Sequence, residues 1–344
     1  MNNLDILKSV FKINDLGKES KSRQIVNSVI NGINSGLLKI GDRLPSLNDL
    51  SFEYLLSKDT VQRAYIELRD RGIIESVPGK GFFIKGKYGE APLRILLVFN
   101  KMTAYKKIIY NAFINAMNTK AIIDLQVHNY DAQRFNNIIK ANLNAYDFYV
   151  IMPFFFEYNK LVNDTFKLIP QEKLVLVNKD VDFIEHPYPV IYEDFENDIQ
   201  ESLTKVLDEI KNYHRLILVF PLDPTSNFEI ITGFEKFCTQ HLLHHDMVLG
   251  TSHVELEYKD LYIVIDDDDL ADFIKICRGK EFKIGVDIGL IAYNEVVLKE
   301  VLEDGITVIS TDFQFMGKTI ADLIFSKKKD KIKNPFRIIR RNSF

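Results

Sequence analysis

The stretches that decide how the first 85 residues fold are GLLKIGDRLPS at 36–46, SKDTVQRAY at 57–65 and PGKGFFI at 78–84. The first contains a Gly-Asp-Arg-Leu-Pro turn, in which Pro45 restricts the backbone. The second begins with Ser57, a residue type that caps helices. The third contains Pro78-Gly79-Lys80, a typical turn. A turn, a capped helix and a second turn predict a small helical domain that ends in a β-hairpin.

Three helices are predicted around these stretches. Apolar residues recur at helical spacing over Lys21–Asn34, and Gly36 ends that helix. Ser46 can cap a second helix, and Ser57 can cap a third over 58–71. For the inner face of the second helix we expect Leu47, Leu50, Tyr54 and Leu55.

Two short apolar runs, 73–77 and 81–85, flank the last turn and predict the strands of a hairpin. Three helices followed by a hairpin form a winged helix-turn-helix. In this motif the second helix of the turn-helix pair enters the major groove of DNA with its N-terminal side chains toward the base edges.

Candidate DNA contacts follow from that placement. Lys58, Asp59, Thr60 and Gln62 lie at the start of the recognition helix, where Gln62 can pair with adenine and Lys58 with guanine or phosphate. The remaining candidates are phosphate-binding or wing-tip residues. They are Ser46, Asn48, Ser57, Arg63, Gly79, Lys80 and Gly81.

These stretches resemble the GntR family of bacterial transcription regulators. They match the family pattern LPS, S-[RK]-x-TV-x-x-A, L-x-x-x-G-[IL] and G-x-G-x-[FY]-[VI] over about 65 residues. The sequence departs from the family at Asn48 and Gln62, where the family often has Arg, and this leaves the base contacts open. The alternative is a winged helix used only for protein contacts.

The chain changes character after residues 86–92, GKYGEAP, which we interpret as a linker. From residue 93 short apolar strands alternate with helices, as in parallel α/β sheets, and the series is long enough for two lobes. The predicted strands are 94–99, 122–127, 148–152, 173–177, 190–192, 215–220, 247–250, 261–265, 283–286 and 307–310, with a final strand at 333–340. The predicted helices are 108–118, 132–141, 194–211, 227–241, 268–278, 294–303 and 316–325.

This body resembles the effector domain of LacI-type repressors, which is similar to periplasmic sugar-binding proteins. The matching pieces occur in the family's order. They include Leu174-Val175-Leu176-Val177-Asn178-Lys179, Tyr192-Glu193-Asp194-Phe195, Gly233-Phe234, Ile284-Gly285-Val286-Asp287, Thr311-Asp312-Phe313 and Arg341-Asn342-Ser343. A GntR head on such a body is the arrangement of arabinose-repressor-type regulators.

The fold class implied is an α+β winged helix-turn-helix head at 1–85, followed by an α/β two-lobed periplasmic-binding-protein-like domain at 93–344. We expect lobe 1 to comprise about 93–191 and 312–330, and lobe 2 about 192–310 and 331–344. Ligands of such folds bind in the crevice at the strand ends.

The resemblance implies an effector site between the lobes, with Asp287 as the foremost candidate and a helix-capping role as its alternative. The other candidates are Asn100, Asn178, Lys179, Ser226, Asp267 and Phe313. The family's sugar-binding Arg falls on Ile230. Either another cation such as Lys179 replaces it, or the ligand is less polar, such as a deoxy sugar.

Composition limits the remaining possibilities. The 344 residues carry a net charge of −4, with +3 on residues 1–90 and −7 on the rest, so only the head is basic. The two cysteines, the lack of a signal pattern and the lack of a long apolar run predict a cytoplasmic protein without membrane contact. His241, His244, His245 and Asp246 have metal-ligand spacing, but a polar helix end is the simpler interpretation.

No motif of a nucleophilic or metal-dependent enzyme is present, and we expect no catalysis, cofactor or bound metal. The prediction is a homodimeric transcriptional regulator, a repressor of sugar-utilisation genes, that binds a pseudo-palindromic operator and is released when a small sugar or deoxy sugar binds between the lobes. Two alternatives remain. In the first, the body serves only for dimerisation or protein binding; in the second, it is a sugar-processing enzyme with the head as a DNA anchor.

Overall fold

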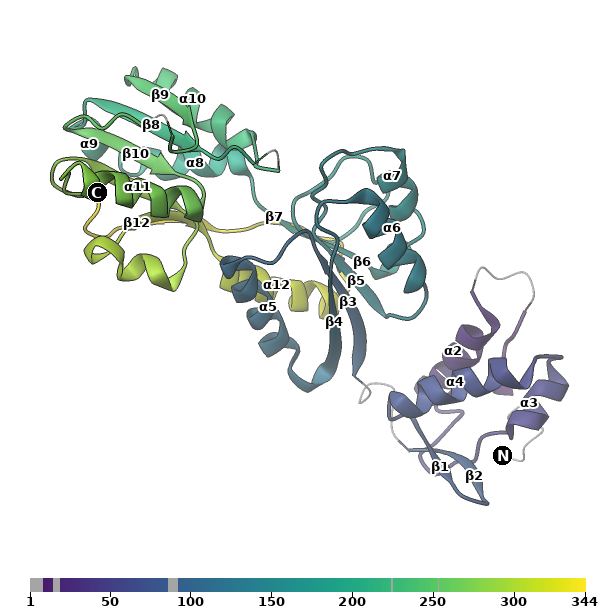
Figure 1. Cartoon of the computed structure of the whole chain (residues 1–344). Coiled ribbons are helices and arrows are strands. Elements are labelled where there is room, and N and C mark those ends of the chain that lie inside the picture. Colours follow the sequence, from purple (N-terminus) through teal and green to yellow (C-terminus); the bar gives the residue numbers. More distant parts are fainter. Residues whose placement is uncertain (1–8, 15–18, 86–91, 224, 253) are drawn as a thin grey trace. The chain divides into compact units, whose positions relative to one another are not determined.

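The computed structural model describes residues 9–14, 19–85, 92–223, 225–252 and 254–344 (Figure 1). The chain divides into two compact units. The first comprises Met1–Ile95, Asn118–Asp124 and Asn142–Phe148, and the second comprises the rest. The predicted linker at 86–92 falls almost entirely on residues 86–91, which lie outside the described residues.

The first unit contains the predicted three helices and hairpin. The helices are α2 (Lys21–Asn34), α3 (Leu47–Glu53) and α4 (Lys58–Asp70), and the antiparallel strands are β1 (Ile74–Val77) and β2 (Gly81–Ile84). Ser20, Ser46 and Ser57 cap the three helices with side-chain oxygens that accept backbone N–H groups. Their apolar faces form one core with β1 and β2, around Ile25, Val29, Leu50, Val61, Tyr65 and Leu68. The winged helix-turn-helix prediction is therefore confirmed as a fold.

The prediction that Leu55 lies on the inner face of the second helix is wrong. This side chain is 93% exposed, and the residue lies beyond the end of α3 with a φ of 52°. A left-handed residue at this place closes the helix, and it turns the following chain toward α4. The apolar spacing at Leu55 therefore does not reflect a core position.

Replacing Leu55 with glycine is expected to stabilise the protein by about 1 kcal/mol, because glycine adopts positive φ without steric cost and little buried surface is lost. Thermal unfolding measures the gain. Phe52→Gly is the matched control, since Phe52 is 82% exposed but lies inside α3, where glycine lowers stability. A melting temperature that falls for both variants would contradict this interpretation of Leu55.

A buried ion cluster joins three segments of the first unit. Asp147 Oδ1 accepts hydrogen bonds from Arg23 of α2 at 3.1 Å and from Arg71, the C-cap of α4, at 3.2 Å. Its Oδ2 accepts the backbone N–H of Arg94 at 2.9 Å. Glu67 pairs with both arginines, at 2.6 and 2.8 Å. Asp147, Arg23 and Arg71 are all buried, so the cluster depends on complete pairing.

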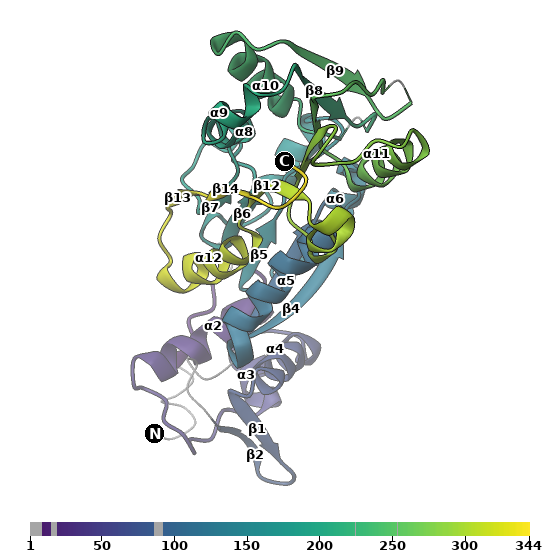
Figure 2. The same ribbon diagram turned by 90° about the vertical axis from the view of Figure 1, so that its left-hand side faces the viewer.

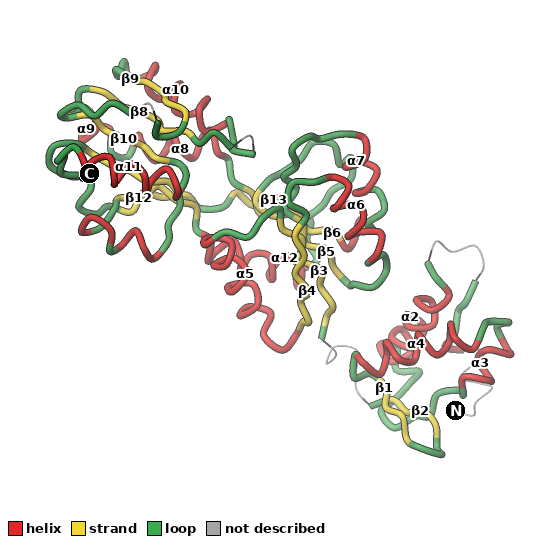
Figure 3. The backbone as a smooth tube through the Cα atoms, viewed as in Figure 1, coloured by secondary structure: helices red, strands yellow, loops and turns green. Residues whose placement is uncertain are grey.

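The body contains two six-stranded sheets. The first has the order β13-β7-β6-β5-β3-β4. In chain order its strands are β3 (Leu93–Phe99), β4 (Ala121–Val127), β5 (Phe148–Ile151), β6 (Leu174–Asn178), β7 (Val190–Tyr192) and β13 (Lys331–Lys333). Helices α5 (Ala104–Met117) and α12 (Phe313–Ser326) lie on one face, and α6 (Ala132–Ala141) and α7 (Lys160–Phe166) on the other (Figure 3).

The second sheet has the order β14-β12-β11-β10-β8-β9, parallel except for the β12–β14 pair. Its strands are β8 (Arg215–Phe220), β9 (His245–Leu249), β10 (Asp260–Val264), β11 (Gly289–Tyr293), β12 (Thr307–Thr311) and β14 (Phe336–Ile339). Figure 2 shows α8 (Phe195–Thr204) and α10 (Glu229–Gln240) on one side of it and α11 (Asp267–Gly279) on the other. The short α9 (Leu207–Ile210) follows α8.

Three chain segments connect the two sheets: β7 to α8, β12 to α12, and β13 to β14. Asn334, 1% exposed, ties them together. Its backbone N–H donates to the Tyr192 carbonyl at 2.7 Å, and its side-chain amide donates to Thr311 Oγ1 at 2.5 Å. The lobes are therefore joined by a compact three-stranded hinge.

The predicted elements differ from the structure near the C-terminus. The strand predicted at 283–286 is wrong, since only an isolated bridge joins Ile284 to Ile288 and the strand is β11. The helix predicted at 294–303 is replaced by two short 3₁₀ turns. The final strand at 333–340 is two strands, of which β13 belongs to the first sheet, so residues 331–333 lie in lobe 1 and not in lobe 2. Helix α7 was not predicted.

No helix of the described residues combines the length and apolar character that a membrane crossing requires.

Candidate functional site

The recognition helix α4 has one buried and one exposed face. Val61, Ala64, Tyr65 and Leu68 are buried, whereas Lys58, Asp59, Gln62 and Arg63 are exposed. All four exposed residues lie within the first two turns of the helix, the part that reaches base edges in this motif. The predicted base-reading residues are thus available to a DNA groove.

Two interactions occupy part of that face. Ser57 Oγ accepts the Thr60 N–H at 3.2 Å and lies 2.8 Å from Thr60 Oγ1. Arg63 pairs with Asp59 at 2.7 Å, but both side chains are more than 60% exposed. A pair this exposed contributes little to stability, so Arg63 can leave Asp59 for a phosphate at small cost.

The hairpin tip and the start of α3 provide the other predicted positions. Gly79 and Gly81 have φ of 72° and 109°, so the turn requires residues that adopt positive φ, and Lys80 between them is exposed. Ser46 is committed to a capping box with Asp49, while Asn48 is exposed. Arg43, which sequence reasoning missed, lies beside the wing, with Nε 3.2 Å from the position of a Cβ on Gly81.

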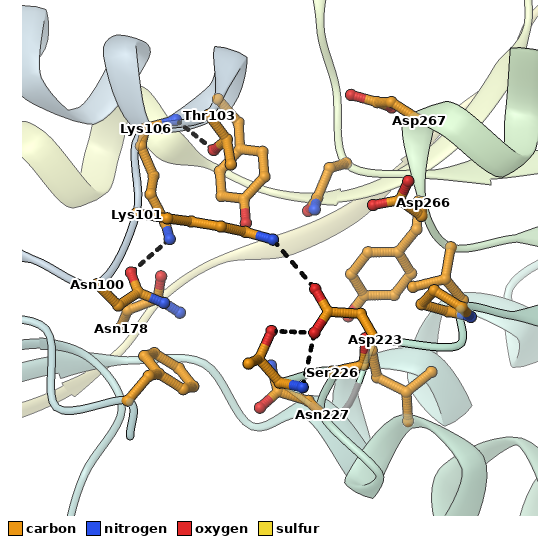
Figure 4. A pocket seen from close by; sticks show the side chains of 18 of the residues that line it. Asn100, Lys101, Thr103, Lys106, Asn178, Asp223, Ser226, Asn227, Asp266 and Asp267 are labelled. Carbon is orange, nitrogen blue, oxygen red and sulfur yellow. Dashed lines mark hydrogen bonds and ion pairs between the residues drawn. The ribbon is translucent and has the colours of Figure 1, made fainter. Parts of the chain in front are cut away.

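A polar pocket of about 410 Å³ lies within the second unit, lined by segments that follow strands of both sheets. The last residue of β6 and residues after β3, β4, β5 and β7 contribute from the first sheet, and residues after β8, β10 and β11 from the second. Figure 4 shows lining side chains that converge from these segments, among them Asn100 and Lys101 of the first sheet and Asp223 of the second. This is the strand-end position at which open α/β sheets bind ligands.

Four of the seven predicted effector residues line this pocket. They are Asn100, Asn178, Ser226 and Asp267. Ile230, the position of the family's Arg, also lines it. The structure thus brings predicted residues from both lobes to one pocket.

The other three predicted residues do not line the pocket. Asp287 precedes β11, at the end opposite the crevice, where its carboxylate accepts the Lys283 N–H at 2.8 Å. The lining residue after that strand is Asn294. Lys179 pairs with Glu229 at 3.5 Å and lies 5.6 Å from the centroid of the Phe154 ring. Phe313 lies behind the lining, with its ring stacked on Tyr105 at 4.8 Å.

Sequence reasoning missed most of the charged lining side chains. They are Lys101, Lys106, Glu193, Asp223, Asp266 and Asp268. Glu193 lay within a matched motif, and Asp266 and Asp268 lay in the acidic run at the start of α11. No pattern distinguished the two lysines from surface residues.

Ion pairs already engage several of these groups. Lys101, after β3, reaches Asp223, after β8, at 3.4 Å, so this pair crosses the pocket (Figure 4). Asp223 also accepts the N–H and hydroxyl of Thr225 at 2.8 and 2.6 Å. Asp267 pairs with Lys299, which is 2% exposed, at 2.7 Å.

Lys106 and Glu193 are buried and strongly perturbed. Lys106 Nζ donates to Asn100 Oδ1 at 2.5 Å, and burial, aided by the charge of Lys101, lowers the pKa of Lys106 to about 7. Burial, aided by the charge of Asp198, raises the pKa of Glu193 to about 8. Both groups therefore titrate near neutral pH, where small changes in charge nearby alter their protonation.

The pocket offers hydroxyl acceptors, donors and aromatic faces. Tyr105, Tyr130, Phe154, Phe195 and Tyr293 supply rings. Among the residues the structure describes, no three His, Cys, Asp or Glu side chains are grouped to hold a metal ion. The arrangement is suited to binding a small polar molecule.

Residues 21–84 match a family model described as bacterial regulatory proteins, gntR family. The chain is 36% identical over 81 residues to the HTH-type transcriptional repressor YtrA of Bacillus subtilis (strain 168). That match covers 24% of this chain and 58% of YtrA, so the chain spans less than two thirds of this curated relative. The GntR resemblance of the head is confirmed.

The body is similar to solved structures of regulators. The trehalose repressor from Escherichia coli superposes with a TM-score of 0.61 at 12% identity, over 72% of this chain and all of that one. A periplasmic binding protein/LacI transcriptional regulator from Alkaliphilus metalliredigens QYMF, complexed with D-xylulofuranose, gives 0.55 at 12% identity, over 73% and 98%. At such identity the likeness shows the fold, which is the predicted two-lobed class.

Proposed function

We propose that the chain is a sequence-specific DNA-binding transcriptional regulator that releases its operator when a small sugar or sugar derivative binds in the pocket. The observation that carries the proposal is the polar pocket at the strand ends, in the same chain as an exposed recognition helix. The names of the similar proteins support both halves: one is a transcriptional repressor, one a trehalose repressor and one a complex with a sugar.

The hinge supports a switching mechanism. A ligand that contacts loops at the strand ends of both sheets favours one separation of the lobes. The three connecting segments, tied together at Asn334, allow each lobe to move as a rigid unit. A ligand must also compete with the Lys101–Asp223 pair, which spans the pocket. In a homodimer, a change in the bodies would alter the spacing of two heads on a pseudo-palindromic operator.

The lining supports a hydroxyl-rich ligand over a deoxy sugar. Ile230 supplies no donor where the resembling family has Arg, but Lys101 and Lys106 supply ammonium donors on the facing lobe. Asp223, Asp266 and Asp267 supply hydroxyl acceptors. Tighter binding of a deoxy sugar than of its parent would contradict this part of the proposal.

The first test is selection of binding sites from random-sequence duplex DNA with the purified protein, followed by anisotropy titrations with and without sugars. We expect enrichment of one pseudo-palindromic sequence and weaker binding when the ligand is present. If no sequence is enriched, the proposal of a sequence-specific DNA-binding regulator is excluded. Enrichment without any ligand response would favour a body that only dimerises or binds a protein, and conversion of a bound sugar would favour an enzyme.

A further inference from the structure

Lys106 is a buried cation that lines the pocket without a carboxylate partner. It lies in the first turn of α5 and is 3% exposed. Its Nζ donates to the neutral Asn100 amide oxygen at 2.5 Å and lies 5.7 Å from the centroid of the Tyr105 ring. Among the described residues, no carboxylate oxygen lies within 4 Å of this ammonium. Figure 4 shows the Lys106 side chain beside Asn100 at the pocket.

The other lining cation differs from Lys106 in this respect. Lys101 pairs with Asp223 at 3.4 Å, and the lining carboxylate of Asp267 has its own partner in Lys299. Glu193 is the acidic group that faces Lys106, but burial favours its neutral form at neutral pH. Lys106 is therefore a lining cation that no carboxylate of the described residues neutralises at ion-pair distance, whereas Lys101 has Asp223.

An unbalanced buried ammonium is costly, and an ammonium has three N–H donors of which one is used here. The backbone around it also favours negative charge. Thr103 and Tyr105, at the start of the 14-residue α5, line the same pocket, and a helix N-terminus carries a partial positive charge. Lysine, helix start and cavity together form a site for an anion.

We propose that the ligand of this pocket carries an anionic group, a carboxylate or a phosphate, that accepts hydrogen bonds from Lys106, while its hydroxyl groups face the carboxylates after β8 and β10. The proposal rests on the proposed function, because it names the chemical class of the effector. Candidate ligands are sugar acids and sugar phosphates, and neutral sugars are excluded as the preferred class.

The proposal predicts a pH dependence. The titratable groups that interact with Lys106 are Lys101, Tyr105, Glu193 and the buried His128, besides the neutral Asn100. An anion binds the protonated lysine and raises its pKa from about 7, so binding takes up a proton. The affinity for a carboxylate ligand then falls about tenfold between pH 6 and pH 8. Ionisation of Glu193, with a pKa of about 8, changes the affinity in the same direction.

The test uses the full chain and three matched sets of probes: glucose, glucuronate and glucose 6-phosphate; galactose, galacturonate and galactose 6-phosphate; ribose, ribonate and ribose 5-phosphate. Isothermal titration calorimetry measures the affinity of each probe for the unchanged protein, for Lys106→Met and for Lys107→Met. Lys107 is the next residue of α5 and is exposed, so it is the matched control. The acid and phosphate arms distinguish the two sources of negative charge.

We expect at least one anionic probe to bind at least tenfold more tightly than its neutral parent. Lys106→Met should weaken the binding of that anionic probe about 10-fold to 100-fold, because a hydrogen bond to a charged group is lost. Lys107→Met should leave this affinity unchanged. The pH profile of the unchanged protein is an independent readout that needs no variant.

Equal or tighter binding of a neutral parent would overturn the inference and leave the proposed function intact. So would an anion preference that survives Lys106→Met, or an affinity for a carboxylate that is constant from pH 6 to pH 8. Failure of all nine probes to bind would overturn the inference and the proposed sugar sensing together.

Discussion

A variant carrying both Lys58→Glu and Lys80→Glu is expected to bind the selected operator at least about 100-fold more weakly than the unchanged protein. Lys58 begins the recognition helix and Lys80 lies at the tip of the wing, so one substitution affects each DNA-facing element. Each replaces a cation that we expect to lie beside DNA phosphates with an anion. Both side chains are exposed, and the melting temperature should stay unchanged.

Anisotropy titrations at several salt concentrations measure this effect. Loss of two phosphate contacts makes the negative slope of log K for operator binding against the logarithm of the salt concentration shallower by about 2. Lys140→Glu, an exposed position in α6 of the second unit, makes the same charge change and should alter operator affinity by less than about twofold. Equal losses for the double variant and for Lys140→Glu would show that net charge alone, and not the predicted interface, governs binding.

Replacing Asp147 with alanine is expected to lower the free energy of unfolding of the first unit by about 3–5 kcal/mol. Arg23 and Arg71 would remain buried with Glu67 as their shared carboxylate partner, and the Arg94 N–H would lose its acceptor. Two arginine Nε atoms already lack hydrogen-bond partners here, so the cluster has little capacity to rearrange.

Urea titration followed by circular dichroism measures this loss. Asp59→Ala is the matched control, because Asp59 also pairs with an arginine but is 74% exposed, and its loss should cost less than about 1 kcal/mol. If the two alanine variants unfold at the same urea concentration, the buried cluster does not stabilise the unit as the geometry implies.

The head was predictable almost residue by residue because each of its boundaries has a local chemical signal. Ser46 and Ser57 cap helices and Gly79 forms a turn, and the structure places all three as expected. Leu55 was mispredicted because helical spacing identifies a face only while the helix continues. The chain leaves α3 before Leu55, and no local signal of glycine or asparagine marks that end.

The strands of the body were predictable where clear turns separate them. The prediction failed within residues 283–293, where two candidate strands follow one another closely. Residues 283–286, Lys-Ile-Gly-Val, overlap the stretch that matches a motif of the LacI-type domains, whereas the continuously buried strand is Gly289–Tyr293. The wrong choice moved the strand end by several residues and assigned Asp287 to the crevice instead of Asn294. An error of register within one motif thus became an error in the site.

The lysines of the pocket were not predictable by any pattern. Lys106 lies in the first turn of an amphipathic helix, where lysine is normally solvated, and only the packing of the tertiary structure buries it. Lys101 becomes a pocket residue because Asp223, 122 positions later in the chain, lies opposite it. Sequence reasoning located the crevice through strand ends, but its charge arises from contacts between distant segments.

The most direct test of the account is reciprocal linkage between operator and effector on the full chain. Operator affinity is measured without ligand and at saturating ligand, and ligand affinity is measured without and with operator. If the pocket controls the head, both affinities fall by the same factor, typically about 5-fold to 150-fold. An operator affinity that is unchanged at saturating ligand would contradict the account, because the pocket would then have no influence on DNA binding.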